Sequence, residues 1–510
     1  MYVRKLPNRS GSTSVQIICK ADGKYRVVET VGTSRDPDEI ERLFQKAKHI
    51  VNQPDPNQYL FFDMHTPTDQ VVKELFESLT NAQIRTIGPE LIYGTLFDRM
   101  GFNQIPEELF RHLVIARLAY PVSKLKTIDY LYRYQGVSYS VSTIYKFLDR
   151  LHSRHKQQVE QIAYHHTEKR LGTVSVVFYD MTTLYFEAEE EDDLRKIGFS
   201  KDGKFQHPQI MIGLLVGEEG LPIGYDLFEG NTFEGHTLLP MLEAIQKKYG
   251  LKQPIVIADA AMLSRSNLTN LAEAKYSFII GARIKNENNQ IKQEILQKVN
   301  AIKNEKAQIC ERGDGTRLVV TWSKKRAQKD ERNRNKGIQR LEKRVKSGRL
   351  TKESINNRGY NKFLRLEGEI NVCIDEEKIK ADQDWDGLKG YLTNTQLNAS
   401  QIVENYSHLW QIEKAFRISK TDLRIRPVHH FRKRRIKAHL CISFVAYSIY
   451  KELELLLKKK NLNLSPSSAS TLTHTMYQMC YRLPDSEKEH NTILKMDDDQ
   501  QALYNVVHKP

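Results

Sequence analysis

Short runs of β-branched and aromatic residues alternate with longer amphipathic stretches through the middle of the chain. Two of these runs, Thr173–Tyr179 and Pro254–Ala258, are too short for helices and are bounded by Gly172 or Pro254, so they predict buried strands. The surrounding pattern predicts strands over Gln209–Val216, Pro222–Phe228 and Tyr276–Ile280, and helices over Thr237–Tyr249 and Ser264–Lys275. Strands that alternate with helices indicate an α/β core that begins near Thr173.

A different pattern precedes this core. Residues 1–34 alternate in strand fashion about a turn at Asp22-Gly23, and a helix is predicted from Asp38 to Asn52. The proline-bearing stretch Gln53–Pro56 then marks a linker, and helices should occupy residues 68–170. We therefore expect a small β-hairpin and helix region over 1–60 and a mainly helical region over 61–170.

Part of the helical region has the spacing of a helix-turn-helix. A short glycine-bearing turn joins Leu125–Tyr134 to Ser140–His152, and Ser140 can cap the second helix. That helix would turn Lys146 and Arg150 outward, where they suit contacts with phosphates or base edges. An ordinary helical hairpin of a bundle gives the same pattern, so both interpretations stay open.

The pattern becomes densely charged after the strand that ends at Ile280. The stretch Lys324–Lys352 is mostly basic and lacks a sustained apolar stripe, which predicts a solvated helix or a partly ordered arm. Strand-like pieces border it over Leu318–Trp322, Phe363–Cys373 and Gly390–Thr393. We expect a core in two parts, over 171–283 and 399–460, with an inserted β-rich subdomain over 284–398 and a C-terminal tail over 461–510.

The composition adds a preference for polyanions. Lys and Arg total 78 against 63 Asp and Glu, and the net charge of +15 favours nucleic acid first and an anionic membrane surface second. The longest apolar helix candidate, Ile436–Leu457, carries Lys437, Lys451 and Glu452, so it predicts a buried helix rather than a membrane span. The scattered cysteines argue for a reducing compartment and against a structural zinc site, and no signal peptide is expected.

Two carboxylates stand where the buried strands are expected to end. Asp180 follows the first run and Asp259 follows the second. Active sites gather at the rim of open α/β sheets, and two carboxylates that meet there repel each other unless a divalent cation neutralises them. Each aspartate by itself is also a common turn or helix-capping residue.

A third acid belongs to a stretch with helical periodicity, Ser400–Lys420. Tyr406, Glu413 and Lys420 are spaced by seven and share one stripe, and apolar neighbours place Glu413 on the face that should enter the core. A salt bridge to Arg417 or Lys420 would satisfy a carboxylate there. Two strand-end aspartates with a core-facing helical glutamate are also the ligand set of a two-metal phosphoryl-transfer site.

These residues resemble a known family. Asp180, Asp259 and Glu413 look like the acidic triad of the DDE transposases of bacterial insertion sequences, which have a ribonuclease-H-like fold. Tyr406, Glu413 and Lys420 match three of the four positions of the Tyr-Arg-Glu-Lys signature of one large group of these enzymes, whereas Leu409 occupies the arginine position. The resemblance spans Thr173–Leu457 and includes Gly198–Gly203, His207–Ile210, Gly220–Thr232 and Arg426–His430.

The resemblance implies an α/β fold, with a ribonuclease-H-like mixed sheet core, an inserted β-rich subdomain and a mainly helical N-terminal DNA-binding region. It also implies two Mg²⁺ ions, replaceable by Mn²⁺, at Asp180, Asp259 and Glu413. Tyr406 and Lys420 would hold a backbone phosphate, and the nearest substitutes for the missing arginine are Arg417 and Arg424. Trp322 would hold a flipped base, although a position in the core is the commoner role of a tryptophan.

The implied activity is cleavage of the ends of a mobile element and joining of its 3′-hydroxyls to target DNA. Double-stranded DNA is then the partner, and a homodimer is the natural assembly because two ends are cut together. The protein would act in the bacterial cytoplasm, at the nucleoid, without a membrane partner. Two alternatives stay open: a ribonuclease-H-like nuclease or resolvase without strand transfer, and a catalytically inactive DNA-binding protein. The acidic run Glu187–Asp193 is expected to be a solvated loop.

Overall fold

The chain folds into two units. A computed structural model describes residues 1–21, 24–52, 73, 76–77, 79–80, 83–201, 203–262, 264–305, 307–348, 350, 352–356, 358–367, 371–483 and 488–509. The predicted turn at Asp22-Gly23 and the predicted linker at Gln53–Pro56 lie outside the described residues. Residues 1–83 and 480–491 form the first unit, and residues 84–479 and 492–510 form the second.

An antiparallel sheet and a helix make up most of the first unit. The strands β1 (Tyr2–Pro7), β2 (Thr13–Ala21) and β3 (Lys24–Ser34) pair in sequence order, and the helix α1 (Pro37–Asn52) follows them. Ala47 of α1 packs with Val15 and Ile17 of β2 in a small apolar cluster. The predicted strands and helix of this region are confirmed.

A large mixed sheet dominates the second unit. Among the described residues it has eight strands in the order β10-β11-β14-β9-β8-β5-β6-β7. The predicted core strands are confirmed as β5 (Val176–Tyr185), β6 (Gln209–Val216), β7 (Pro222–Glu229), β8 (Ile255–Ala258) and β9 (Ser277–Ala282). β5 pairs in parallel with β8 and β8 with β9, whereas the pairs of β5 with β6 and β6 with β7 are antiparallel.

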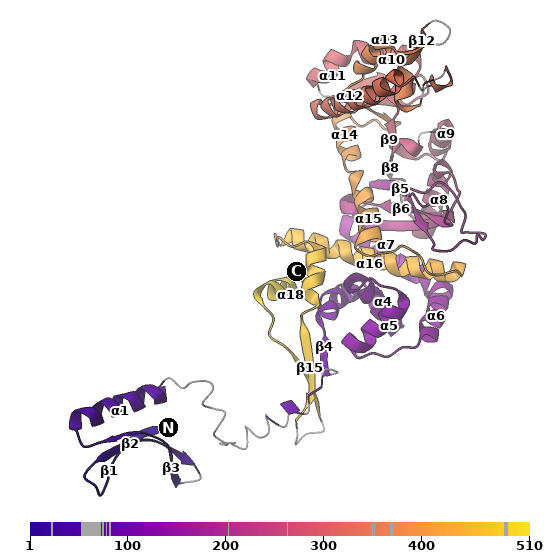
Figure 1. Cartoon of the computed structure of the whole chain (residues 1–510). Helices are drawn as coiled ribbons and strands as arrows, with labels where there is room; N and C mark the ends of the chain where they lie inside the picture. The colour runs from indigo at the N-terminus through magenta and orange to yellow at the C-terminus, as the bar shows by residue number, and fades with distance from the viewer. Residues whose placement is uncertain are drawn as a thin grey trace. The chain divides into compact units, whose positions relative to one another are not determined.

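Helices cover both faces of this sheet. Side chains alternate along β5, so Val176, Phe178 and Leu184 enter one apolar core while Val177 and Tyr179 enter another. The first core also takes residues of α15 (Trp410–Thr421) and α16 (Lys433–Lys459), and the second takes residues of α8 (Leu238–Tyr249) and α9 (Arg265–Glu273). The resulting α/β/α layering confirms the α/β expectation (Figure 1).

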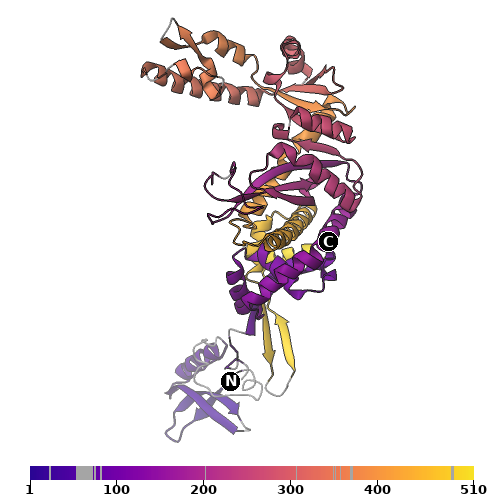
Figure 2. The same cartoon turned by 90° about the vertical axis from the view of Figure 1, so that its right-hand side faces the viewer.

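The long helix α16 lies between the sheet and the helices that precede it in the chain. It packs against α4 (Glu108–Ala119) and α6 (Val141–Arg150), and also against β7 and α7 (Lys156–Leu171), a helix that itself packs on β7 (Figures 1 and 2). α16 is almost wholly buried, as predicted, and none of the described helices is long and apolar enough to cross a membrane. The remaining elements before the sheet are β4 (Ile84–Thr86), α3 (Thr95–Arg99) and α5 (Lys124–Tyr130).

The C-terminal segment after α16 contains helices and strands. It contains α17 (Pro466–Thr473), β15 (Tyr477–Arg482), β16 (Glu489–Ile493) and α18 (Asp498–His508). Leu503 and Val507 of α18 enter the same core as α4 and α16, and β15 pairs with β4. Leu503, Val506 and Val507 have helical spacing, but the sequence does not show which element they pack against, so only the tertiary structure reveals this role.

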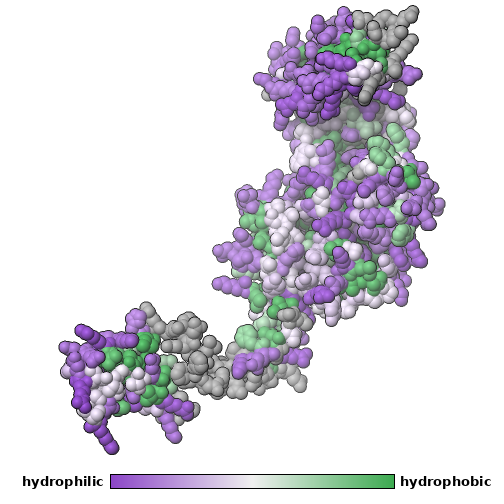
Figure 3. Space-filling model, in the orientation of Figure 1, coloured by the Kyte–Doolittle hydropathy of each residue, from purple (hydrophilic) through white to green (hydrophobic). Residues whose placement is uncertain are grey.

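The insertion between β9 and α14 (Ala399–Ser407) combines strands with helices. Its strands β10 (Ala307–Glu311), β11 (Arg317–Trp322) and β14 (Leu388–Thr393) continue the core sheet beyond β9, an arrangement that the sequence pattern does not indicate. The basic arm forms α12 (Lys324–Lys346), and the surface above it is largely hydrophilic (Figure 3). The other elements are α10 (Asn289–Gln297), α11 (Val299–Glu305), β12 (Leu364–Glu367), β13 (Asn371–Ile374) and α13 (Glu376–Gln383).

One buried ion pair ties α12 to the end of the insertion. Arg334 is 4% exposed, and its two terminal nitrogens donate hydrogen bonds of 2.6 and 2.7 Å to the Asp386 carboxylate. Removing one partner of a buried pair leaves the other charge uncompensated. We therefore expect Arg334→Ala to lower the free energy of unfolding of the insertion by about 3 kcal/mol, measured by hydrogen exchange of α12 amides. The exposed neighbour Arg332, changed to alanine, is the control, and equal effects of the two variants would contradict this role.

Candidate active site

The strand register brings Asp180 and Asp259 together. The parallel pairing of β5 with β8 ends with Tyr179 opposite Ala258; Asp180 is the next residue of β5, and Asp259 is the first residue after β8. Neighbouring strands lie about 4.8 Å apart, so the two carboxylates start from adjacent backbone positions. The prediction that Asp180 ends its strand is wrong, because β5 continues to Tyr185 through its pairing with β6. Asp180 nevertheless lies at the point where the neighbouring parallel strand β8 ends, so it is still at the rim of the parallel part of the sheet.

Both aspartates project toward the face of the sheet that α15 covers. By the two-residue alternation of strands, Asp180 shares a face with Phe178, and Asp259 shares a face with Ile257. Phe178 and Ile257 both belong to the apolar core that contains α15 and α16. The two carboxylates therefore face the helix that carries the third predicted acid.

The carboxyl of Asp180 is held in an unfavourable electrostatic environment. Burial raises its pKa to about 6, and the charges of Asp259 and Glu234 act in the same direction. Lys201 and a hydrogen bond from the Met181 backbone N–H act against this rise. The cost of desolvating the carboxylate outweighs the attraction of the neighbouring lysine.

Lys201 bridges this acidic cluster. Its Nζ lies 3.6 Å from Asp180 Oδ1 and 2.7 Å from Glu234 Oε1, and it donates to the Met181 carbonyl oxygen at 2.7 Å. The pKa of Lys201 is raised because Asp180 and Glu234 outweigh its own burial. An internal ammonium group therefore offsets part of the negative charge that the two strands bring together.

The donor set suits a hard divalent cation. Asp180 Oδ1 accepts the Met181 N–H at 2.7 Å and Asp259 Oδ1 accepts the Ala261 N–H at 2.8 Å, so each carboxylate keeps a second oxygen for another partner. Oxygen ligands with excess negative charge are what Mg²⁺ and Mn²⁺ prefer. In the part of the chain that the structure describes, however, no three histidine, cysteine, aspartate or glutamate side chains stand close enough to hold one ion.

Glu413 does not occupy the position that helical periodicity predicts. The expected continuous helix is interrupted after Ser407 and restarts at Trp410, with Leu409 turned into the core at 9% exposure. This break shifts the phase of the stripe, so Tyr406 is buried while Glu413 is exposed. The prediction that Glu413 faces the core is therefore wrong, although its helix lies on the face of the two aspartates.

Tyr406 connects Glu413 to the sheet. Its hydroxyl leaves so little room at Gly281 of β9 that a Cβ there would lie 2.5 Å away and would also lie 3.2 Å from the Ala260 nitrogen. Burial raises the pKa of Tyr406, and the charges of Asp259 and Glu413 add to the rise. Lys389 Nζ lies 4.5 Å from the centre of the Tyr406 ring, and Glu413 raises the otherwise lowered pKa of Lys389.

The other predicted residues of α15 and its following loop take different positions. Lys420 lines a small cavity of about 30 Å³ with Thr182 and Leu184, which places it beside the strand that carries Asp180. Arg417 and Arg424 are exposed. The structure therefore brings Asp180, Asp259 and Tyr406 together, and it places Lys420 of α15 beside Thr182 and Leu184, farther along β5.

The predicted DNA-binding helix is present as α6. Ser140 caps it by accepting the Thr143 N–H at 3.1 Å, as predicted, and Lys146 is exposed. Arg150 is engaged instead, because its Nε and Nη2 donate to the Glu107 carboxylate at 2.8 and 2.9 Å.

Trp322 stands apart from the aspartates in the chain's insertion. It is half-buried against an apolar cluster that includes Leu388, and its Nε1 donates to the Asp386 carbonyl oxygen at 3.0 Å. These contacts support the core interpretation of this tryptophan.

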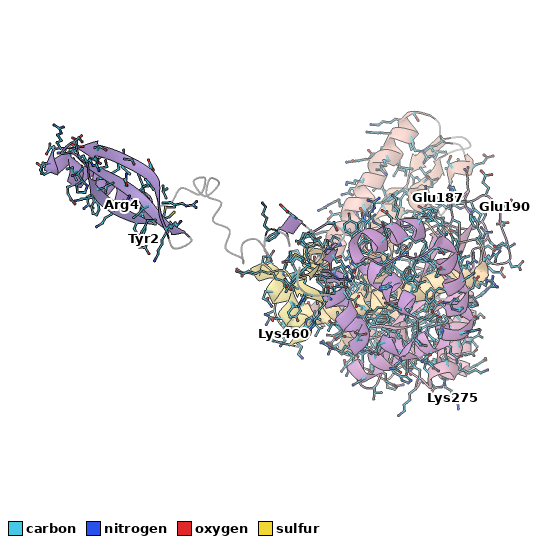
Figure 4. All side chains as sticks on the ribbon, turned by 90° about the horizontal axis from the view of Figure 1, so that it is seen from below. Tyr2, Arg4, Glu187, Glu190, Lys275 and Lys460 are labelled. Atoms are coloured by element: carbon cyan, nitrogen blue, oxygen red, sulfur yellow. The ribbon has the colours of Figure 1, made fainter. Side chains whose placement is uncertain are left out.

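The acidic run after β5 is solvated, as predicted. Glu187 and Glu190 are exposed and point away from the protein (Figure 4).

The functional candidates that sequence reasoning missed are Lys201, Glu234 and Lys389. Lys201 lies within Gly198–Gly203, a stretch that resembles the family, and that resemblance was the available signal.

The raised pKa of Asp180 makes a sign-specific prediction for stability. Its pKa is 3.8 in an unperturbed chain and about 6 in the folded protein, so ionisation destabilises the fold progressively as the pH rises through this range. Asp180→Asn should raise the free energy of unfolding above this range by up to about 3 kcal/mol, and by little below it. Urea unfolding in EDTA across these pH values tests this, with the exposed Glu190→Gln as control. If the difference in free energy of unfolding between Asp180→Asn and the wild type did not change with pH, the raised pKa of Asp180 would be contradicted.

Several known proteins are similar to this chain. The piggyBac transposase in its synaptic complex with hairpin DNA shares 11% identity at a TM-score of 0.37, over 76% of this chain and 78% of that chain. The Mos1 transposase paired-end complex with the left transposon end shares 13% identity at a TM-score of 0.17, over 48% and 68% of the two chains. The Mos1 mariner paired end complex with Mn shares 13% identity at 0.15, over 48% and 77%. No curated protein matches the chain.

A family match covers the region built around the two aspartates. Residues 173–449 match the family described as "Transposase DDE domain". The match begins just before β5, contains α15, and ends within α16, so it spans the sheet and more than half of the 510 residues. The chain therefore belongs to the transposase DDE domain family and is a DDE-type transposase.

Proposed function

We propose that this protein is the cut-and-paste transposase of a bacterial insertion sequence, from the group with the Tyr-Arg-Glu-Lys signature. It binds the ends of the element, cleaves them by metal-dependent phosphodiester hydrolysis and joins the 3′-hydroxyls to target DNA. The observation that carries the proposal is the adjacency of Asp180 and Asp259 on the face of the sheet that α15 covers. The parallel and antiparallel strands around them suit a ribonuclease-H-like core.

Asp180 and Asp259 are the residues that would hold two Mg²⁺ ions, or Mn²⁺ in their place, with Glu413 completing one set of ligands. Such ions lower the pKa of an attacking water or 3′-hydroxyl and stabilise charge on the leaving oxygen. Lys201 limits the repulsion of the two carboxylates before any cation arrives, and Glu234 offers this lysine an alternative partner. Glu413 lies in the first turn of α15, just after the break between α14 and α15.

The remaining residues of the signature would position the DNA strand. Tyr406 lies beside the residue that follows Asp259, and Lys420 lies along β5, so both suit contacts with phosphates near the cut. Leu409 is buried in the helix break and cannot replace the arginine of the signature. Exposed Arg417 and Arg424, on and just after α15, are the arginines nearest to position 409 in sequence.

Recognition of the element's ends would belong to the helices before the sheet. α5 and α6 have the arrangement that motivated the helix-turn-helix prediction, and the outward face of α6 carries Lys146. A homodimer would hold the two ends together during cleavage. The partner in each subunit is double-stranded DNA, first the element ends and then the target.

The first test removes one carboxylate. Asp180→Asn should abolish Mg²⁺-dependent cleavage of end-containing DNA and keep end binding, because the DNA contacts lie on other elements. It should also remove the rise in melting temperature that Mg²⁺ gives the wild-type protein, since ligand binding stabilises the fold that binds it. Glu190→Gln, which changes an exposed acid of the same region, should behave as wild type. Cleavage by Asp180→Asn at the original rate would refute the site.

Strand transfer separates the proposal from its closest alternative. Given pre-cut ends and a second duplex, a transposase inserts the ends, whereas a nuclease or resolvase leaves them unjoined. Glu413→Gln should lower both cleavage and joining by at least about a hundredfold, as expected for loss of a metal ligand. Normal activity of this variant would remove Glu413 from the site.

A further prediction concerns the contribution of α6 to DNA binding. Lys146→Ala should weaken binding of end DNA and lower the slope of log affinity against log salt by about one, because one phosphate contact is lost. Lys169, a lysine in the last turn of α7, is the control when changed to alanine. Fluorescence anisotropy at several salt concentrations measures both slopes, and identical slopes for the two variants would exclude this contact.

A further inference from the structure

A cavity lined by cations lies between the helices before the sheet and the loop after α15. It has a volume of about 400 Å³ and is walled by the end of α4, the start of α5, α6, the loop after α15 and one residue of α16. Its polar lining is Arg117, Ser123, Lys124, Tyr145, Arg424, Arg426, His429, His430 and His439. Among the described residues that line it, none is acidic.

Two of these cations are buried without a carboxylate partner. Arg117 and Lys124 are 5% and 8% exposed. Arg117 Nη1 reaches the carbonyl oxygens of Leu423 and Arg424 only at 3.4 Å each, and its Nε has no hydrogen-bond partner among the described residues. Buried charges in folded proteins are almost always paired, so this pair of cations calls for an anion.

The lowered pKa values of neighbouring groups reflect the same excess of buried positive charge. Burial lowers the pKa of His430 to about 3, and the charges of Lys124, Arg117 and Arg435 lower it further. Burial and the charge of Arg117 together lower the pKa of Lys124. His439 Nε2 contacts the Ile425 carbonyl oxygen at 3.2 Å, and its Nδ1 lacks a partner in the described part of the chain. For Arg117 and Lys124 themselves, no described carboxylate offsets the cost of burial.

We propose that this cavity is a phosphate-binding site that holds a backbone phosphate of DNA through Arg117 and Lys124. The choice of DNA as the source of the phosphate rests on the proposed function, whereas the anion site itself rests on the unpaired buried cations. A phosphate oxygen can accept hydrogen bonds from both side chains at once and supplies the missing negative charge.

The position of the cavity favours a polymer over a free ion. One wall belongs to α5 and α6, the proposed end-recognition helices, and another to the loop that leaves α15, which carries Glu413. Arg424 and Leu125, both at the wall, are exposed, so the cavity opens to the surface. Apolar residues such as Val122 and Pro427 line the remainder and suit the sugar faces of a strand. A phosphate held here would couple recognition of an end to placement of α15.

The test uses the full-length protein in EDTA, where no cleavage takes place. Inorganic phosphate, compared with chloride at equal ionic strength, should raise the melting temperature of the wild-type protein. Lys124→Met should lose this rise and should lower the salt slope of DNA binding by about one. Lys126→Met, which removes an exposed lysine two residues away, should keep both properties. Arg424→Ala, at the exposed wall, provides a second variant if Lys124→Met fails to fold, and it should reduce the phosphate effect.

The outcomes are distinct. No phosphate-dependent rise in the wild-type protein, or an equal rise in Lys124→Met, would overturn the site. A rise that Lys124→Met loses while the DNA salt slope stays unchanged would overturn the assignment to DNA and leave a site for free phosphate. Since binding is measured without metal, inactivity of the protein in cleavage assays would refute the proposed function without altering these readings.

Discussion

Parallel pairing of β5 with β8 places two carboxylates at one point on the sheet, and the surrounding structure compensates for the repulsion between them. The last register pair, Tyr179 with Ala258, leaves Asp180 and Asp259 as adjacent residues on neighbouring strands. Burial raises the pKa of Asp180 to about 6, which shows that the fold holds this acid at a cost in stability. Lys201 reduces this cost without removing it, whereas the charge of Glu234 adds to it. Proteins commonly keep such destabilised groups where chemistry needs them.

The second unit has an excess of negative charge at one place and an excess of positive charge at another. The helix α15 and the loop that follows it connect these two places. At the sheet, Asp180 and Glu234 gather around the ammonium group of Lys201. At the cavity behind the loop, Arg117 and Lys124 are buried without an acid. A divalent cation would neutralise the first excess and a phosphate the second. A metal-dependent enzyme acting on a phosphodiester polymer would bring both charges to the protein together.

Local sequence signals were sufficient to predict the elements whose boundaries depend on nearby residues alone. The β-branched runs predicted the core strands because residues buried on both faces of a sheet read as continuous apolar segments. Ser140 and Ser264 act as helix caps because a side-chain oxygen at that position satisfies a free backbone N–H of the first turn. The local sequence signals failed where contacts with a neighbouring element decided where a strand or helix ends. β5 runs past Asp180 because β6 pairs with it, and the helix before Glu413 breaks where Leu409 turns into the core.

The sequence by itself determined the existence of the core strands, the two aspartates, the excess of positive charge and the family to which the chain belongs, because each depends on residue type and short-range spacing. Tertiary structure alone decided that Lys201 and Glu234 join the aspartates, that Arg150 pairs with Glu107, that Glu413 is exposed, and that Arg117 shares a cavity with Lys124 and the loop after α15. These relations join residues distant along the chain. Their energies depend on burial and on nearby charges, and neither quantity exists until the elements have packed.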